Sequence, residues 1–346
     1  MSGIGVVLAS GAALRQVRPP RAVMPPAITL EWVGDIALST QRGLPPGGLD
    51  RALAPVRALL HHADITLGNL EGTLSTGGGS KCGGVGSGDC FAFQAPPSIA
   101  GELRTAGFRL VNQANNHSLD YGRSGRAQTI AALRRAHVAY TGLPGEITVL
   151  HTDGARVAFV GFAPYAYDAN LLDIRAAQSL VRRARKAAPY VVVIIHAGAE
   201  GAAALHTPGG SEYYLGENRG DARAFAHAVI NAGASIVVGS GPHVVRGIQR
   251  YHGRLIAYSL GNFVGYHTLA GGGILSESAI LRVELGPGGR VLAGRWIPIR
   301  LVEGLPRADP SGASAKLVAK LSREDFPHNH YDISPRGYFR QLDPQL

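Results

Sequence analysis

The chain has 346 residues, 45% of them hydrophobic, and a formal net charge of +10. Charged residues make up only 17% of it, which excludes a largely disordered chain, and its length allows one large core or two smaller ones. The positive charge favours an anionic partner, but the arginines are scattered and no basic helix carries interleaved aromatic residues, so no nucleic-acid partner is expected.

Residues 1–27 are predicted to be an appendage to the folded part. Residues 4–14 are apolar but too short to span a bilayer, and residues 15–26 form a linker rich in Pro and Arg. The segment is similar to the apolar part of a signal peptide, although no Lys or Arg precedes Arg15, and a disordered tail is the alternative. We expect export and an extracytoplasmic location.

Cys82 and Cys90 are the only two cysteines, and they lie in a Gly/Ser-rich stretch without hydrophobic periodicity. Ordering such a stretch costs conformational entropy, which a short crosslink offsets in part. A zinc site is the alternative, but two further soft ligands are lacking nearby. We predict a disulfide, which agrees with an oxidising compartment.

The first predicted strands end in polar side chains. Residues 28–33 form an apolar, β-prone run that is followed by Asp35, and residues 64–67 form a second run that leads to Asn69 and Glu71. Proteins of the α/β class keep their ligands at the carboxyl edge of the sheet. A turn explains one such polar residue on its own, whereas polar residues after several strands indicate a site.

The third strand, residues 107–111, leads to the most polar loop of the chain, which contains Asn115, Asn116, His117 and Asp120. The simplest interpretation is a turn with solvated amides in which Asp120 caps the following helix. For Asp120 alone this interpretation is favoured. For Asn116 and His117 a functional site is favoured, because similar polar loops recur along the chain.

The second half of the chain repeats the pattern. Residues 190–195 lead to His196 and Glu200, for which a metal or acid–base role is favoured over a buried core imidazole. Two later strands lead in the same way to His243 and Asn262. Helices are expected at residues 49–62, 97–106, 125–136, 174–188, 221–232 and 314–321. The recurrence of polar residues after apolar strands predicts convergent ligands on one sheet edge.

Several common enzyme motifs are absent from the sequence. It contains no Gly-x-Gly-x-x-Gly after a strand, no phosphate-binding P-loop and no Gly-x-Ser-x-Gly elbow. These absences argue against a dinucleotide-binding enzyme, a P-loop nucleotidase and a serine hydrolase of the common type.

The polar motifs together resemble those of the CapA family, the poly-γ-glutamate capsule biosynthesis proteins. The matching motifs, in order, are Gly34-Asp35, Asn69-Leu70-Glu71-Gly72, Asn115-Asn116-His117-Ser118-Leu119-Asp120-Tyr121-Gly122, His196 with Glu200, Gly241-Pro242-His243, and Tyr258-Ser259-Leu260-Gly261-Asn262-Phe263. The resemblance covers residues 28–300 and implies an α/β fold of the calcineurin-like metallophosphoesterase type, a four-layer αββα sandwich of two facing mixed sheets. Residues 301–346 are then expected to form a C-terminal extension that packs on this domain.

The resemblance also implies roles for the polar residues. The implied metal ligands are Asp35, Glu71, Asn116, His196 and His243. His117 is implied as the catalytic acid or charge stabiliser, held by Asp120, and the further site residues are Asn69, Asn115, Glu200 and Asn262. Carboxylate, amide and imidazole ligands suit Mn, Fe or Zn, and a bound ion can acidify water to a nucleophile.

Two departures from the metallophosphatase pattern bear on the number of ions. Ala37 stands where a second histidine of the first motif belongs, and residues 239–243 contain one histidine instead of two. We therefore expect one metal position to bind weakly or not at all.

Two functions remain: an exported metal-dependent hydrolase of a phosphoester or a polymer amide or ester, and a non-catalytic accessory protein that binds a polyanion. Either would work with an anionic polymer such as poly-γ-glutamate and with membrane-bound synthesis machinery.

Overall fold

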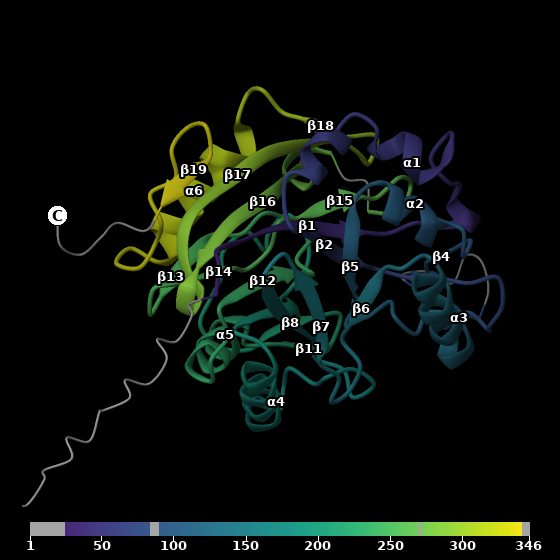
Figure 1. Ribbon diagram of the computed structural model, residues 1–346. Coiled ribbons are helices and arrows are strands. Elements are labelled where there is room, and N and C mark those ends of the chain that lie inside the picture. The colour runs from purple at the N-terminus through teal and green to yellow at the C-terminus, as the bar shows by residue number, and fades with distance from the viewer. Residues whose placement is uncertain (1–24, 84–89, 270–271, 341–346) are drawn as a thin grey trace, which may run out of the picture.

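Two β-sheets face each other in the computed structural model, which describes residues 25–83, 90–269 and 272–340 (Figure 1). Most of the predicted leader, residues 1–24, lies outside the described residues. The larger sheet has the order β18-β17-β16-β1-β2-β5-β6, with β15 beside β1 and β19 beside β17. Its strands are β1 (Ile28–Ile36), β2 (Ile65–Leu70), β5 (Phe108–Asn112), β6 (Ala139–Thr141), β15 (Asn262–Val264), β16 (Glu277–Gly286), β17 (Arg290–Val302), β18 (Leu305–Ala308) and β19 (Tyr338–Arg340).

The smaller sheet has the order β13-β14-β12-β9-β8-β7, with antiparallel strands at its two edges and parallel strands between them. Its strands are β7 (Thr148–Thr152), β8 (Ala155–Phe162), β9 (Tyr190–His196), β12 (Ile236–Ser240), β13 (Ile248–Tyr251) and β14 (Arg254–Ala257). Two short pairs stand apart from both sheets: β3 (Thr73–Leu74) with β4 (Gln94–Ala95), and β10 (Glu212–Tyr214) with β11 (Glu217–Gly220).

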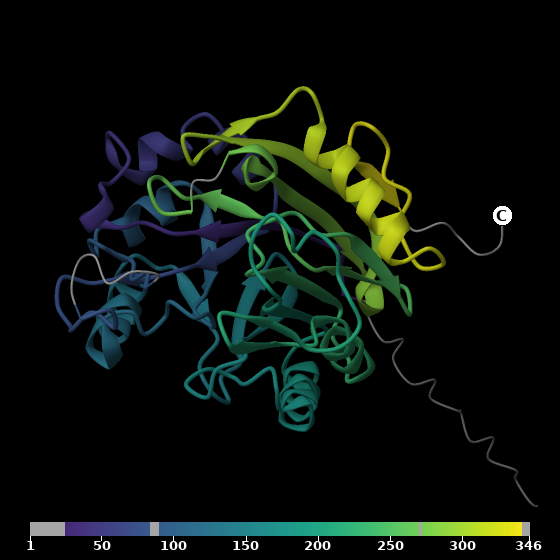
Figure 2. The same cartoon turned by 180° about the vertical axis from the view of Figure 1, so that it is seen from behind.

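Helices cover the outer faces of both sheets (Figures 1 and 2). The helices of the described residues are α1 (Gly48–Leu53), α2 (Ile99–Thr105), α3 (Gly122–Arg135), α4 (Ile174–Ala187), α5 (Ala222–Asn231) and α6 (Ala313–Asp325). The first three pack on the outside of the larger sheet, and α4 and α5 pack on the outside of the smaller one. This arrangement is the predicted four-layer αββα sandwich. None of the helices in the described part of the chain has both the length and the apolar character needed to cross a membrane.

The cores follow from the twofold alternation of side chains along each strand. On β1, Trp32 points between the two sheets, whereas its neighbour Val33 points to the outer face, where α1 and α2 pack. On the smaller sheet, Val192 faces the inner core and Val193 the outer one. Because both faces of these strands are buried, their sequences form continuous apolar runs, which made them easy to recognise.

Two parts of the chain differ from expectation. The helix predicted for residues 49–62 is split into α1 and a 3₁₀ turn at Arg57–His61, because Pro55 between them lacks a backbone N–H. At the other end, β17 runs through residue 300, and β18 and β19 pair with it. Helix α6 also contributes to the core between the sheets, so residues 301–340 take part in building the sandwich.

Candidate metal centre

The predicted site residues lie where the edges of the two sheets meet. Parallel strands β1, β2 and β5 end at one edge of the larger sheet, and β9 and β12 end at the facing edge of the smaller one. The Trp32 indole N–H donates to the Gly239 carbonyl oxygen at 3.1 Å, which ties the sheets together below this edge. At the edge itself, Asn69 Nδ2 lies 3.3 Å from His196 Nδ1 across the junction.

Glu71, directly after β2, is the centre of the cluster. Its side chain is fully buried, and neither carboxylate oxygen has a hydrogen-bond partner among the described residues. The Nε2 atoms of His196, His243 and His117 lie 3.7, 3.8 and 4.0 Å from its Oε1 atom. These separations exceed hydrogen-bonding distance but suit ligands that share one cation, since two ligands each about 2.1 Å from an ion lie about 3–4 Å apart.

Each of the three imidazoles is held through its other nitrogen. The pairs are His117 Nδ1 with Asp120 Oδ2 at 2.8 Å, His243 Nδ1 with Asn262 Oδ1 at 2.9 Å, and His196 Nδ1 with Ser240 Oγ at 3.2 Å. An oxygen that accepts the Nδ1 proton fixes both the tautomer and the ring orientation. A neutral imidazole held in this way turns its Nε2 lone pair toward Glu71, as a metal ligand would.

Asp35, near the end of β1, supplies the second carboxylate of the centre. Its Oδ1 atom accepts from Asn69 Nδ2 at 2.8 Å, and its Oδ2 atom lies 3.2 Å from His243 Nδ1. Ligand atoms of Asp35, Glu71 and His243 all lie within 4.8 Å of one another, and all three residues are buried. These three residues could therefore hold a divalent ion.

A buried network of asparagines supports the loop after β5. Asn69 Oδ1 accepts from Asn112 Nδ2 at 2.9 Å and from Asn115 Nδ2 at 3.1 Å. Asn115 Oδ1 in turn accepts from the backbone N–H of His117 at 3.0 Å, so Asn69 and Asn115 position the loop. Asn116 is different, because its buried Oδ1 atom has no hydrogen-bond partner in the part of the chain that the structure describes. That oxygen is free to act as a ligand.

The expectation that Asp120 caps the next helix is wrong. The residue at the N-cap of α3 is Tyr121, and it makes no side-chain cap hydrogen bond. The Asp120 carboxylate instead accepts from His117 Nδ1 and, at 2.6 Å, from the backbone N–H of Phe93, and its Oδ1 atom lies 2.7 Å from Lys81 Nζ. These contacts give Asp120 a role in holding His117.

Glu200 and Arg219 complete the cluster on the side of the smaller sheet. Glu200 Oε2 lies 3.5 Å from His243 Nε2, and Glu200 Oε1 lies 2.8 Å from Arg219 Nη2. Arg219 was not predicted, because β11 is short and nothing in its sequence indicates that this side chain turns inward. Lys81 was also missed, although its place beside Cys82 was a usable signal, since the predicted Cys82–Cys90 disulfide is present.

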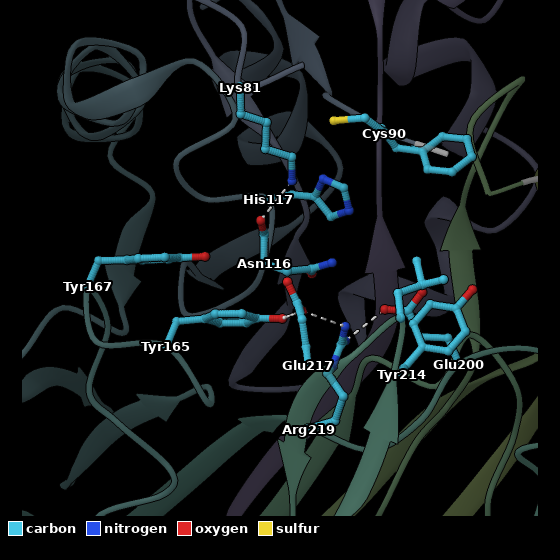
Figure 3. Close-up of a pocket in the computed structure, with 12 residues that line it drawn as sticks. Lys81, Cys90, Asn116, His117, Tyr165, Tyr167, Glu200, Tyr214, Glu217 and Arg219 are labelled. Carbon is cyan, nitrogen blue, oxygen red and sulfur yellow. Dashed lines mark hydrogen bonds and ion pairs between the residues drawn. The ribbon is translucent and has the colours of Figure 1, made fainter. Parts of the chain in front are cut away.

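A cavity of about 560 Å³ adjoins the cluster, because His117, Glu200 and Arg219 form part of its lining (Figure 3). It is lined by Lys81, Cys90, Phe91, Asn116, His117, Tyr165, Tyr167, Glu200, Tyr214, Leu215, Glu217 and Arg219. The rings of Tyr165 and Tyr167 stack with centroids 5.3 Å apart and form one wall. Cationic and aromatic side chains therefore surround the opening that leads to the carboxylates and imidazoles.

Burial and charge shift the pKa values of the central groups in opposite directions. Burial, with help from Asp35, raises the pKa of Glu71 well above its usual value, and burial lowers that of His196. For His243, burial is outweighed by neighbouring carboxylates, chiefly that of Glu71, which hold its pKa well above the usual value. The raised pKa values of Glu71 and His243 mean that both groups hold a proton more readily, so the centre favours added positive charge.

The donor set fits a divalent metal ion. A buried carboxylate without hydrogen-bond partners among the described residues is costly unless a cation compensates it. Carboxylate, imidazole and amide donors suit Mn, Fe or Zn. The residues that could hold the ion are Asp35, Glu71 and His243. Further donors are His196, whose Nε2 atom lies 3.7 Å from Glu71 Oε1, and Asn116, whose Oδ1 atom has no hydrogen-bond partner among the described residues.

A two-sheet αββα sandwich with buried carboxylates and imidazoles at its joined sheet edges defines a protein with a metallophosphatase-like fold and a candidate metal site. The sequence profile of the family described as bacterial capsule synthesis protein PGA_cap matches residues 29–267. The chain belongs to this family, and the resemblance to CapA proteins is confirmed.

Two relatives carry names from capsule biology. The capsule biosynthesis protein CapA of Bacillus anthracis is 28% identical over 323 residues, covering 86% of this chain and 73% of that protein. The PGA biosynthesis protein CapA of Bacillus subtilis is 26% identical over 256 residues, covering 68% of this chain and 63% of that protein. The chain thus spans about two thirds to three quarters of the length of these relatives.

Solved structures with similar folds are more distant. A 5'-nucleotidase precursor from Thermus thermophilus is 15% identical with a TM-score of 0.46, covering 86% of this chain and 59% of that one. A putative 5'-nucleotidase from Staphylococcus aureus is 14% identical with a TM-score of 0.46, covering 85% of this chain and 58% of that one. TM-scores below 0.5 support no statement about activity.

Proposed function

We propose that this protein is an exported, metal-dependent hydrolase that cleaves a phosphoester, or an amide or ester, of an anionic capsule or envelope polymer. One observation carries the proposal: the buried Glu71 carboxylate faces three imidazole Nε2 atoms at 3.7–4.0 Å beside an open cavity. A purely structural carboxylate would be expected to have hydrogen-bond partners, and Glu71 has none among the described residues.

The residues of the site divide into metal ligands and groups that handle protons. A divalent ion held by Asp35, Glu71 and His243 would supply an acidified water and would polarise the attacked bond. His117 lines the cavity and, as the imidazolium ion that the Asp120 carboxylate stabilises from 2.8 Å, would donate its Nε2 proton to the leaving group. Lys81, paired with Asp120, would place positive charge beside the attacked group.

The cavity suits a segment of an anionic chain. Lys81 and Arg219 line it as cations, and the stacked rings of Tyr165 and Tyr167 offer a flat apolar wall. The net charge of +10 adds long-range attraction for a polyanion. The names of the capsule and PGA biosynthesis relatives make poly-γ-glutamate the first polymer to test and membrane-bound synthesis machinery the first partner to seek.

The disulfide supports the extracytoplasmic part of the proposal. Cys82 and Cys90 are crosslinked at the rim of the cavity, and such bonds persist in oxidising compartments. Localisation by cell fractionation tests this part independently of catalysis.

Metal content and hydrolysis of the full chain are the decisive measurements. After reconstitution with Mn, Fe or Zn, elemental analysis should find bound metal in the wild type and none in Asp35→Ala. The exposed Asp332→Ala variant serves as the matched control and should bind metal like the wild type. A screen of phosphomonoesters, phosphodiesters and γ-glutamyl amides should then reveal activity that His117→Gln abolishes without loss of metal.

The second candidate function is a non-catalytic polyanion-binding component of polymer synthesis and export, favoured by the net charge of +10. Absence of metal from the reconstituted wild type, together with salt-sensitive binding of poly-γ-glutamate, would replace the hydrolase proposal with this one.

A further inference from the structure

Arg219 places a guanidinium group inside the metal centre. It lies on β11, and its carbonyl oxygen accepts from the backbone N–H of Gly198 at 3.0 Å, which ties β11 to the loop that follows β9. The residue is 1% exposed, and its side chain points into the cavity toward Glu200 (Figure 3). Arg219 is therefore fixed in place by backbone contacts and burial.

The guanidinium group faces His196, one of the histidines that resemble metal ligands. Arg219 Nη2 lies 3.4 Å from His196 Nε2 and 2.8 Å from Glu200 Oε1. His196 Nδ1 lies 3.2 Å from Ser240 Oγ, which can accept its proton. In that tautomer the Nε2 lone pair accepts from Arg219, so a cation already occupies the side of His196 where an ion would bind.

We propose that the centre binds a single divalent ion, at Asp35, Glu71 and His243, and that the Arg219 guanidinium group takes the place of a second ion beside His196. This inference rests on the metal-dependent function proposed above. It assigns His196 to the support of Glu71 and Arg219 instead of to a complete second metal site.

The charges of the centre balance with one ion. Three buried or nearly buried carboxylates, those of Asp35, Glu71 and Glu200, and the one guanidinium group give a net charge of −2 when the imidazoles are neutral. One divalent ion neutralises this charge, whereas two would leave an excess of positive charge in a buried site. Two other carboxylates do not enter this count. Lys81 pairs with Asp120 at 2.7 Å, and Glu217, 3.7 Å from Arg219 Nη1, is exposed to solvent over about half of its side chain.

The ligands are also unevenly distributed. Asp35, Glu71 and His243 bring their ligand atoms within 4.8 Å of one another. A second ion at His196 Nε2 would lie about 2.1 Å from that atom and would be repelled by the adjacent guanidinium group. Ala37 replaces one histidine of the metallophosphatase pattern, and residues 239–243 contain one histidine instead of two, so no further nitrogen donor is present that could overcome this repulsion.

The test counts ions in the full chain, independently of activity. The protein is stripped with a chelator, reloaded with Mn²⁺, and examined by elemental analysis and electron paramagnetic resonance. The wild type should bind one ion per chain and give the six-line spectrum of an isolated Mn²⁺. Arg219→Met should take up a second ion beside the first and give a spin-coupled spectrum, because Glu200 and His196 are released.

Two further variants separate charge from folding. Arg219→Lys keeps a positive charge and should bind one ion. Arg246→Met is the matched control, because Arg246 is equally buried and lies 2.7 Å from Glu212 but is not part of the centre; it should also bind one ion. Thermal melting of each variant identifies any that fail to fold.

Two ions in the wild type would overturn the single-ion inference while leaving the proposed function standing. The ion count of the wild type therefore tests the inference even if Arg219→Met does not fold. A folded Arg219→Met variant that still binds one ion would also overturn it. No ion in the wild type would instead refute the metal-dependent function itself, and the inference with it.

Discussion

Two buried glutamates, Glu31 on β1 and Glu71 directly after β2, show how a structural carboxylate differs from a functional one. Glu31 and Glu71 are both 0% exposed. Glu31 accepts from Arg282 Nε at 2.7 Å and from Thr66 Oγ1 at 3.0 Å, so the chain itself satisfies the charge. Glu71 faces three imidazole nitrogens at 3.7–4.0 Å, beyond hydrogen-bonding distance.

Burial alone therefore does not separate the two roles. A buried charge is costly in either place and needs compensation. For Glu31 the compensation is a fixed guanidinium group inside the protein. For Glu71 the nearest groups are arranged as ligands, and the compensation is complete only with a cation from outside. Substitutions at the two positions should consequently have opposite effects on stability and on metal binding.

The largest expected effect is on metal binding by Glu71→Gln. Loss of the central carboxylate should lower the affinity for Mn²⁺ by about 100-fold or more, since even supporting residues contribute 10- to 100-fold. The metal-free variant should be at least as stable as the wild type, because a buried charge is removed. Isothermal titration calorimetry and melting with and without metal measure both effects. Unchanged affinity would show that Glu71 is not a ligand.

Glu31→Gln should show the reverse pattern. Replacing the carboxylate weakens charge-assisted hydrogen bonds to Arg282, and the free energy of unfolding should fall by about 2 kcal/mol. Metal affinity should not change, because Glu31 faces Arg282 and Thr66 and takes no part in the metal centre. Urea unfolding of the metal-free protein measures the loss. A fall in metal affinity as large as that of Glu71→Gln would remove the distinction between the two glutamates.

The sequence predicted the residues at the ends of the strands better than it predicted the residues that contact them from other parts of the chain. Apolar runs buried on both faces identify β1, β2, β5 and β9, and the residues that follow them, such as Asp35 and His196, must then lie near one another. Arg219 could not be found in this way, because it lies on a short hairpin outside both sheets. Its inward direction depends on how that hairpin packs against the loop after β9, which local sequence does not encode.

The helix cap predicted for Asp120 was wrong for a similar reason. An Asp close before a helix is typical of a cap, and local sequence favours that interpretation, but α3 begins at Gly122 and its cap position is Tyr121. Lys81 and Phe93 lie 39 and 27 positions away, and they approach Asp120 only because the chain returns to the cavity around the disulfide. Tertiary contacts of this range override a local preference.

Asp120→Asn should have an intermediate effect. Asp120 is a buried carboxylate like Glu31, satisfied by the chain, but it touches the site through His117. Losing the ion pair with Lys81 and the charge-assisted hydrogen bond from His117 should cost about 1–2 kcal/mol of stability. Metal affinity should stay at the wild-type level while hydrolysis falls, as measured by calorimetry and by initial rates. Loss of metal without loss of stability would assign Asp120 to the ligand set instead.

The smallest expected effect on the site follows removal of the disulfide by Cys82→Ser with Cys90→Ser. The two cysteines are separated by only 8 positions in sequence, and the entropy that such a crosslink removes from the unfolded chain corresponds to a loss of stability of about 2.5 kcal/mol. Its main effect should be local, because Lys81 reaches Asp120 from the residue next to Cys82. Metal affinity should therefore remain unchanged, while hydrolysis falls in the same direction as in Asp120→Asn. Calorimetry of the double variant measures its stability and its metal affinity, and initial rates measure hydrolysis. A loss of metal would mean that the cavity rim, and not only the Glu71 cluster, holds the ion, and the contrast between Glu31 and Glu71 would no longer define the site.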